Sequence, residues 1–221
     1  EPEGYGHAMS NRIALLLVGT LLLGTSQASA QSDLRDSTRA ILFTGGGFGG
    51  SFHLHTETSV PLAGTITNDS DSDLDPTPLV GLRGDVPILE YLAVGGQFGA
   101  SFWRLDGGNQ RNTLLDFDVV PRGRIPFTVG KLLLEPYVAV PIGFTLNVWN
   151  QDNKVTSNQN RTNAGWNLGV LGGFSILTRS HFGAMVGLGW MHHSAYDSYD
   201  NVNLRGSLDQ FTMHFGVMYA L

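Results

Sequence analysis

The stretch Phe211-Thr-Met-His-Phe-Gly-Val-Met-Tyr-Ala-Leu221 alternates without a break between two kinds of side chain. Its odd-numbered positions are all apolar or aromatic: Phe211, Met213, Phe215, Val217, Tyr219 and Leu221. Its even-numbered positions are small, polar or sulfur-containing: Thr212, His214, Gly216, Met218 and Ala220. Because successive side chains of a β-strand point to opposite faces, this pattern predicts a strand with one wholly apolar face. A protein core or a lipid bilayer must cover that face.

Seven further segments alternate in the same way, which makes eight in all. They are 40–54, 80–86, 92–102, 115–127, 134–148, 166–176 and 182–190. Segments of about ten residues with period-two alternation are typical of transmembrane β-strands. Their apolar faces are too large to fit inside a small soluble barrel, so we expect lipid to cover them. The sequence therefore predicts an all-β fold, an eight-stranded antiparallel up-and-down transmembrane β-barrel.

The connections between these segments support the same interpretation. Long polar connections are expected at 56–78, 104–113, 149–164 and 195–208, and short ones at 86–91, 127–132 and 177–181. Outer-membrane barrels show this asymmetry between long extracellular loops and short periplasmic turns. Aromatic residues near the segment ends suggest a girdle at the membrane interface: Trp103, Trp149, Trp166, Trp190 and Tyr196.

The composition excludes several classes of protein. The chain has 221 residues, no cysteine and 14% charged residues, so it has neither a disulfide framework nor a thiolate metal site. A net charge of −6 without a basic patch argues against nucleic-acid binding. A hydrophobic content of 42% is too low for a helical membrane protein. The 29 glycines suit closely packed strands in a small barrel.

The N-terminal region predicts export from the cytoplasm. A basic start at Met9–Arg12 precedes an apolar run from Ile13 to Leu23, and Ala28-Ser29-Ala30 forms a small-residue cleavage site. We interpret 9–30 as a signal peptide and 31–221 as the barrel domain, with 1–8 an upstream extension of doubtful origin. An even strand number then places both mature termini in the periplasm of a Gram-negative bacterium.

The end of the chain resembles a known family. His214, Gly216, Tyr219 and Leu221 follow the order of the terminal insertion signal of outer-membrane proteins, with Leu221 in place of the usual Phe. With the signal peptide, the chain resembles the small OmpA/OmpX-like outer-membrane β-barrels. The resemblance implies recognition by the barrel assembly machinery, contact with outer-membrane lipid and lipopolysaccharide, and a monomeric state. It does not imply a particular activity.

Seven charged residues have the parity of the barrel interior. They are Arg83, Asp85, Asp116, Asp118, Arg122, Arg124 and Glu135. The interior of an eight-stranded barrel is just wide enough to be filled by side chains, so opposite charges there should pair. We expect a salt-bridged plug that stabilises the barrel. The alternative is a gate whose ion pairs exchange to open a narrow pore.

A second group of polar residues has outward parity. His192 and Ser194 share the parity of Trp190, and Asp209 should lie beside His192 on the next strand. A serine, a base and a carboxylate in this arrangement could activate the serine. The group is similar to the His-x-Ser and acidic residue of lipid A 3-O-deacylases, although Ala195 stands where that family has asparagine and Asp209 replaces glutamate. The other interpretation is a set of polar residues at the membrane interface.

Acidic residues gather in one expected loop. Asp69, Asp71, Asp73 and Asp75 have a spacing that partly fits a calcium loop. Leu74 stands where such a loop requires glycine, and the final glutamate ligand is missing. We expect a solvated extracellular loop, with weak Ca²⁺ or Mg²⁺ binding left open and no other cofactor.

Three functions remain open on the sequence. The first is a structural or surface-interaction role through the extracellular loops. The second is a lipid A 3-O-deacylase-like serine esterase at the outer leaflet. The third is a narrow pore or a channel for small apolar ligands.

Overall fold

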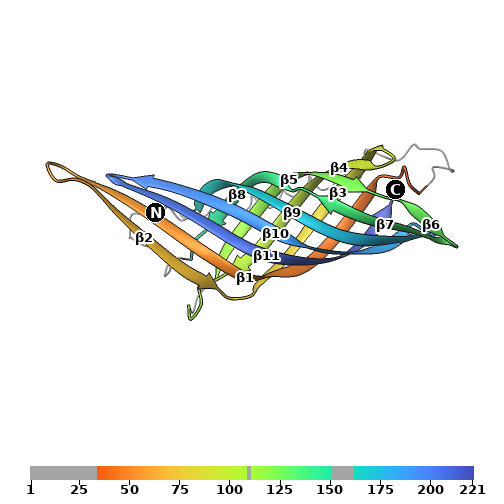
Figure 1. Ribbon diagram of the computed structural model, residues 1–221, viewed down its shortest axis with the longest axis horizontal. Coiled ribbons are helices and arrows are strands. Elements are labelled where there is room, and N and C mark those ends of the chain that lie inside the picture. Colours follow the sequence, from red (N-terminus) through yellow and green to blue (C-terminus); the bar gives the residue numbers. More distant parts are fainter. Residues whose placement is uncertain (1–33, 109–110, 151–161) are drawn as a thin grey trace, which may run out of the picture.

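The computed structural model describes residues 34–108, 111–150 and 162–221, which form one antiparallel sheet closed on itself (Figure 1). The predicted segments 1–8 and 9–30 lie outside the described residues. The strands are β1 (Arg39–Val60), β2 (Gly64–Leu74), β3 (Thr77–Leu89), β4 (Leu92–Trp103), β5 (Asn112–Arg124), β6 (Phe127–Val129), β7 (Leu132–Ala139), β8 (Ile142–Val148), β9 (Thr162–Thr178), β10 (Phe182–Tyr199) and β11 (Val202–Ala220). Among the described residues, no helix is long and apolar enough to cross a membrane, and that finding says nothing about strands.

Three prolines interrupt otherwise continuous strands. The eleven strands therefore make up eight continuous barrel strands, which we call staves. β2 runs on into β3 past Pro76, β5 into β6 past Pro126, and β7 into β8 past Pro141. In the first case β1 pairs with both halves, and in the third β9 does. Proline has no backbone N–H to give to the ladder, which explains the breaks. Pairing of β11 with β1 and of β9 with β10 closes the ring, so the predicted eight-stranded barrel is confirmed.

The barrel has an apolar outside, and its inside holds buried charged side chains next to an apolar cluster that includes Ile41, Phe43 and Leu171. Aliphatic and aromatic side chains cover the outer surface; they include Leu42, Leu82, Val119, Val138, Ile142, Phe144, Val170, Leu188, Phe215 and Val217. Arginine, aspartate and glutamate side chains are buried within. Such an exterior needs lipid to cover it, and the closed ring leaves no unpaired edge in the bilayer. We conclude that the barrel spans a membrane.

Four strands extend well beyond the apolar band at one end of the barrel (Figure 1, left). β1, β10 and β11 have 22, 18 and 19 residues, whereas about 9–11 suffice to cross a bilayer. We call residues 50–60, 64–74, 192–199 and 202–209 the polar extension. Its strand order is β2-β1-β11-β10.

The polar extension corrects two sequence predictions. The expected loops 56–78 and 195–208 are mostly strand, and the turns cover only 61–63 and 200–201. A strand with water on its outer face needs no apolar face, so it lacks the alternation that marks a lipid-facing strand. The expected long connections near 104–113 and 149–164 do lie between strands, although parts of both fall outside the described residues.

A β-bulge separates the two halves of β1. The register with β11 shifts between Phe48 and Ser51, and Gly49 has a φ of 58°. An inserted residue reverses the alternation of the side chains that follow. Phe43 therefore faces inward before the bulge and Phe52 faces inward after it. The single alternating segment predicted over 40–54 would put Phe52 on the lipid face, which is wrong because the bulge interrupts the alternation.

Two of the expected girdle residues lie inside the barrel instead. Trp103 and Trp149 are 1% and 5% exposed and pack against Phe52, with ring centroids 5.2 and 5.9 Å from it. Together they form an apolar plug near the polar extension. Trp166 and Trp190 do face outward, as expected.

Candidate functional site

The interior charges form networks rather than one cluster. Glu135 accepts hydrogen bonds from three side chains: Arg39, Arg124 and Ser175. The Oε1 atom of Glu135 lies 2.8 Å from Arg39 Nη2 and 3.1 Å from Arg124 Nη1. Since both arginines point at one buried carboxylate, the network holds three staves together at the end of the barrel where β1 begins.

A second network lies next to the first. Asp85 accepts from Arg83 Nε at 2.5 Å and from Arg122 Nη1 at 2.9 Å. The Arg122 guanidinium also stacks on the Tyr137 ring, 4.1 Å from its centroid, and donates to Ser175. Arg83 lies on the same strand as Asp85, whereas Arg122 reaches Asp85 from β5, and the opposite charges compensate each other.

The remaining two predicted interior residues pair without arginine. Asp116 accepts from Asn167 Nδ2 at 3.0 Å and contacts His193 Nε2 at 3.2 Å. Asp118 accepts from Gln97 at 3.1 Å. The predicted residues therefore all lie in the interior, but Asp116 and Asp118 belong to a separate group.

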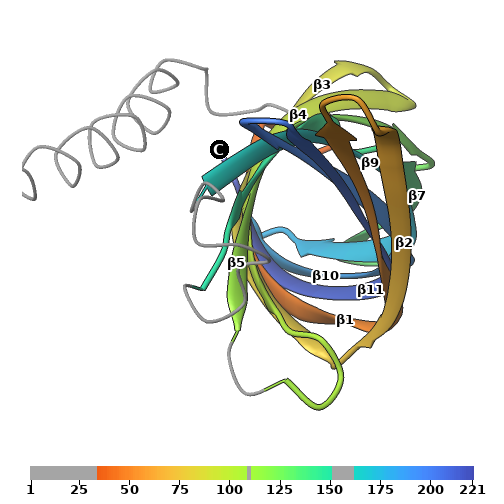
Figure 2. The same cartoon turned by 90° about the vertical axis from the view of Figure 1, so that its left-hand side faces the viewer.

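Sequence reasoning missed the polar neutral members of these networks and two basic ones, Arg39 and His193. Arg39 precedes the first clearly alternating segment, and His193 was passed over in favour of its outward neighbours. The parity of His193 with Met191 could have placed it inside. Figure 2 looks along the barrel from the polar extension, and the strands ring the space that these side chains occupy.

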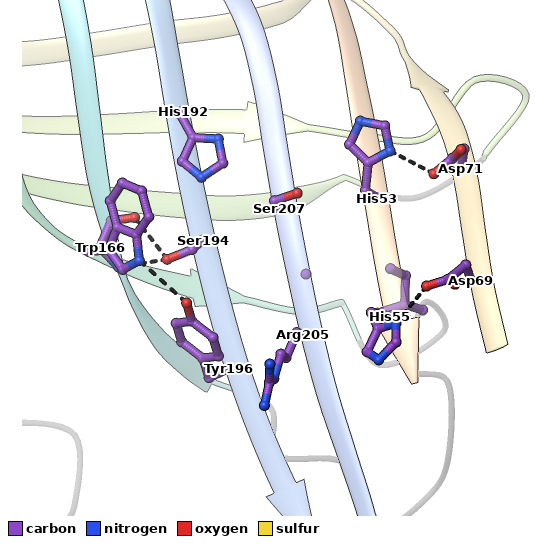
Figure 3. Close-up of a pocket in the computed structure, with 12 residues that line it drawn as sticks. His53, His55, Asp69, Asp71, Trp166, His192, Ser194, Tyr196, Arg205 and Ser207 are labelled. Atoms are coloured by element: carbon purple, nitrogen blue, oxygen red, sulfur yellow. Dashed lines mark hydrogen bonds and ion pairs between the residues drawn. The ribbon is translucent and has the colours of Figure 1, made fainter. Parts of the chain in front are cut away.

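A second candidate site lies on the outer face of the polar extension. A pocket of about 240 Å³ opens there between side chains of five strands (Figure 3). Its lining is mostly polar: His53, His55, Asp69, Asp71, Trp166, His192, Ser194, Tyr196, Arg205 and Ser207, with Leu54 and Gly206.

The structure brings His192 and Asp209 together. They are direct register partners on β10 and β11, and His192 Nδ1 lies 2.9 Å from Asp209 Oδ1. The His192 ring also packs on Trp166, with a centroid distance of 4.8 Å. A histidine held by a carboxylate at Nδ1 can act as a base through Nε2.

The structure gives Ser194 different partners. Its hydroxyl donates to the Trp166 carbonyl at 3.2 Å and accepts from the Trp166 N–H at 3.1 Å. In the described part of the chain, no hydrogen bond joins Ser194 to His192. The Ser194 side chain thus replaces ladder bonds between β9 and β10, where direct pairing skips from His193 to Tyr196. The catalytic role of His192, Ser194 and Asp209 stays a prediction.

Two further histidines pair with aspartates across β1 and β2. His53 Nδ1 lies 2.6 Å from Asp71 Oδ1, and His55 Nδ1 lies 2.5 Å from Asp69 Oδ1. The hydrogen bonds of His55 to Asp69 and then Glu57 raise its pKa above the usual 6.5. These pairs fasten β2 to β1 on a surface exposed to water.

The acidic segment is therefore a strand and not a calcium loop. Asp69, Asp71 and Asp73 share one face of β2, where alternate residues lie about 7 Å apart. Asp75, just beyond β2, is bonded to Arg104. An extended strand cannot wrap its carboxylates around one ion, and the described residues contain no group of three or more metal-ligating side chains suited to a metal.

The C-terminal residues complete the closure of the barrel. His214 lies inside, stacked on Phe43 with a centroid distance of 5.2 Å. Gly216 also faces inward, where an added Cβ would lie 2.8 Å from Met185 Cγ. Tyr219 and Leu221 face outward, and the Leu221 N–H donates to the Thr38 carbonyl at 2.8 Å. These contacts explain the residue types structurally, while their role as an insertion signal stays a prediction.

The comparisons with known proteins identify neither a family nor an activity for this chain. No protein-family model and no curated protein matches the chain. Among solved structures, the chain is similar to the outer membrane protein AlkL in lipid bilayers, at 11% identity and a TM-score of 0.49 over 88% of this chain and 95% of that one. It is also similar to Neisserial surface protein A, at 12% identity and a TM-score of 0.42 over 82% of this chain and 97% of that one. For Ail of Yersinia pestis the identity is 12% and the TM-score 0.33, over 83% of this chain and 99% of that one. At such low sequence identities and TM-scores, the similarity gives no information on activity. The fold assignment rests on the strand pairing described above.

Proposed function

We propose that the protein is an outer-membrane β-barrel of a Gram-negative bacterium that acts at the cell surface through its polar extension. One observation carries the proposal: the membrane-spanning part is filled by buried ion pairs and packed apolar side chains, while the polar side chains in contact with solvent gather on the extension. The chain termini then lie on the periplasmic side. The predicted signal peptide at 9–30 and the resemblance of the C-terminal residues to an insertion signal support this location. We infer that the barrel assembly machinery inserts the protein as a monomer.

Accessibility in intact cells tests this orientation. The chain has no cysteine, so a single introduced cysteine reports its own position. Leu62, in the turn between β1 and β2, is fully exposed, and Lys131 lies in the turn between β6 and β7 at the other end. A membrane-impermeant maleimide should label the variant Leu62→Cys in intact cells and label Lys131→Cys only after lysis. The opposite pattern would contradict the proposal.

The filled interior argues against the pore function. Opening a path for ions would separate buried pairs such as Arg39–Glu135 and Arg122–Asp85, which costs several kcal/mol per uncompensated charge. We therefore expect no conductance steps when the purified barrel is added to a planar bilayer. Reproducible single-channel steps from the wild-type protein would favour the narrow-pore alternative.

The outer face of the extension has features suited to lipopolysaccharide. Arg205 is exposed beside Tyr196 and His55, its register partners, and Trp166 donates to the Tyr196 hydroxyl at 3.4 Å. Aromatic side chains of this kind sit at the membrane interface, and a guanidinium binds phosphate by paired hydrogen bonds. We infer that this surface contacts the phosphate-bearing headgroups of the outer leaflet.

A second candidate is a lipid A 3-O-deacylase-like esterase, favoured by the His192–Asp209 hydrogen bond. In that reaction Ser194 would be the nucleophile, His192 the base and Asp209 the orienting carboxylate. The Ser194 hydroxyl would first have to leave the Trp166 backbone by rotation about χ1. Mass spectrometry of lipid A from cells expressing the protein tests this candidate. Loss of one acyl chain with wild type but not with Ser194→Ala supports it, and an unchanged acyl pattern with wild type removes it.

A further inference from the structure

A second serine, which the sequence did not single out, lies in a hydrogen-bonded chain with a histidine and an aspartate. Ser51 Oγ is 3.2 Å from His53 Nε2, and His53 Nδ1 is 2.6 Å from Asp71 Oδ1. The hydroxyl meets Nε2 while the carboxylate holds Nδ1, so the imidazole can take the serine proton and remain oriented. This is the connectivity that activates a serine nucleophile. Ser194 does not show it, because its hydroxyl is bonded to the Trp166 backbone.

The bulge in β1 puts this group on the outer face. Arg39 and Phe43 face inward, so unbroken alternation would send Ser51 and His53 into the barrel as well. The bulge at Gly49 reverses the alternation and turns both side chains to the outer face, where His53 lines the pocket and Ser51 lies beside it, within hydrogen-bond distance of His53. Bulges beside active sites commonly re-aim a side chain in this way.

The group is open to a substrate. The His53 and Asp71 side chains are 48% and 77% exposed, and both line the outer pocket. Ser207 lies directly opposite His53 on β11, between His53 and the β10 side chains in Figure 3. Within the described residues the Ser207 hydroxyl has no hydrogen-bond partner, so it is a free donor for the oxygen of a bound carbonyl.

The charges around Ser51 indicate which substrate fits. Its direct register partners are Asp209 on β11 and Asp73 on β2. Two carboxylates beside the nucleophile oppose the negative charge that develops on the substrate oxygen. A positive charge on the substrate close to the reacting carbonyl offsets that repulsion.

We propose that Ser51, His53 and Asp71 form a serine esterase site for acyl esters that carry a positive charge near the scissile carbonyl. The inference goes beyond the proposed surface role, from which it takes only the exposure of the extension to water. Its nucleophile, base and orienting carboxylate all differ from those of the Ser194 candidate, although Asp209 borders both sites.

The reaction proceeds in two balanced steps. Ser51 Oγ bonds to the carbonyl carbon as its proton passes to His53 Nε2, and Asp71 stabilises the resulting imidazolium. The alcohol leaves with that proton, which gives acyl-Ser51. Water then gives one proton to His53 and attacks the acyl carbon, which releases the carboxylic acid and returns the proton to Ser51. The net change is one ester bond hydrolysed by one water molecule.

A fluorophosphonate probe on the full-length protein, folded in detergent, tests the nucleophile. We expect phosphonylation of Ser51, located by peptide mass spectrometry and lost in Ser51→Ala. His53→Asn should reduce labelling at least tenfold. Ser198→Ala is the matched control, because Ser198 faces outward on the same extension but donates to Asn203. Heat-modifiable gel mobility checks that every variant is folded.

The outcomes separate the candidates. Label on Ser51 that His53→Asn removes supports the inference. Absence of label on Ser51 in the folded wild type overturns it, and label on Ser194 alone overturns it in favour of the deacylase candidate. The maleimide and conductance experiments test the surface role and do not affect the fluorophosphonate result. Failure of the proposed surface role can therefore be distinguished from failure of the esterase inference.

Two ester substrates test the charge preference. The p-nitrophenyl ester of trimethylglycine carries a fixed positive charge beside the carbonyl, and p-nitrophenyl acetate does not. We expect kcat/KM, divided by the rate constant of spontaneous hydrolysis of the same ester, to be at least tenfold higher for the cationic ester, with the ratio reduced in Asp73→Asn. Equal values for the two esters, or a ratio unchanged by Asp73→Asn, would contradict the assigned substrate class.

Discussion

The membrane-spanning staves and the polar extension are built from the same strands but follow different rules. In the barrel, lipid covers one face, and ion pairs together with packed apolar side chains fill the other. The lipid-facing strands therefore carry an apolar side chain at every second position. In the extension, polar residues of β1 and β2 cover the outer face, and cross-strand pairs such as His53–Asp71 take the place of lipid contact. Period-two alternation of apolar residues therefore indicates a strand that contacts lipid, and a strand that faces water can lack it.

We expect the largest effect on the free energy of unfolding when a buried carboxylate, rather than an exposed one, loses its charge. Glu135→Gln keeps the volume of the side chain but removes the charge that pairs with Arg39 and Arg124. We expect a loss of about 3–5 kcal/mol in the free energy of unfolding, because two arginines lose their buried counter-charge. Urea titration followed by heat-modifiable mobility measures it. Glu90→Gln, which breaks an exposed pair with Arg35, should cost less than about 1 kcal/mol, and equal losses would contradict the account.

Two tryptophans offer a comparison of the plug with the outer surface. Trp103 is enclosed by other side chains and donates to Asn147 at 3.1 Å, whereas Trp190 is 37% exposed on the outer surface. Trp103→Ala should lower the free energy of unfolding by about 3–5 kcal/mol, since it opens a cavity inside. Trp190→Ala should cost clearly less, because lipid or detergent refills the space. The same urea titration compares them, and a larger loss at Trp190 would show that the plug is not packed as described.

Removing the bulge should damage the extension and spare the barrel. Deletion of Gly49 would turn Phe52 outward and His53 inward, reversing both faces of the extension. We expect limited proteolysis to cleave within 54–72 in the variant, while the heat-modifiable band of the barrel persists. A deletion variant as protease-resistant as wild type would mean that the bulge does not set the facing of these strands.

The smallest expected effect is a pH dependence confined to the extension. The pKa of His55 is raised in the folded state, so its contribution to stability is complete below the ordinary value of 6.5 and is lost as pH rises through the folded-state value. The exchange protection of β2 amides should fall slightly between mildly acidic and mildly basic pH. His55→Gln should flatten that fall; a fall of the same size in the variant would exclude His55 as its source.

Much of the barrel could be predicted from sequence because lipid contact leaves a pattern. The eight lipid-facing segments, the interior position of Arg122 and the pairing of His192 with Asp209 all follow from parity and strand ends. The bulge at Gly49 could not be placed, because the surrounding glycines give no side chain by which to follow the alternation. Without it, Ser51 and His53 could not be assigned to the outer face.

The acidic partners of the histidines were hidden for a related reason. Asp69 and Asp71 lie on a strand without an apolar face, so their sequence is typical of a loop. Only the register of β2 against β1 shows that each lies opposite a histidine. A pattern of alternate serine and histidine at Ser51, His53 and His55 was the one signal that could have pointed to the site.

The central claim is that the extension is a folded sheet standing beyond the membrane. Hydrogen–deuterium exchange of the protein in lipid nanodiscs tests it directly, at the amides of 52–58 in β1 and 66–72 in β2. The account predicts exchange at least about 100-fold slower than for an unfolded chain at the amides that the ladder uses. Exchange at the unfolded rate throughout both ranges would mean that these residues are loops, and it would contradict the account.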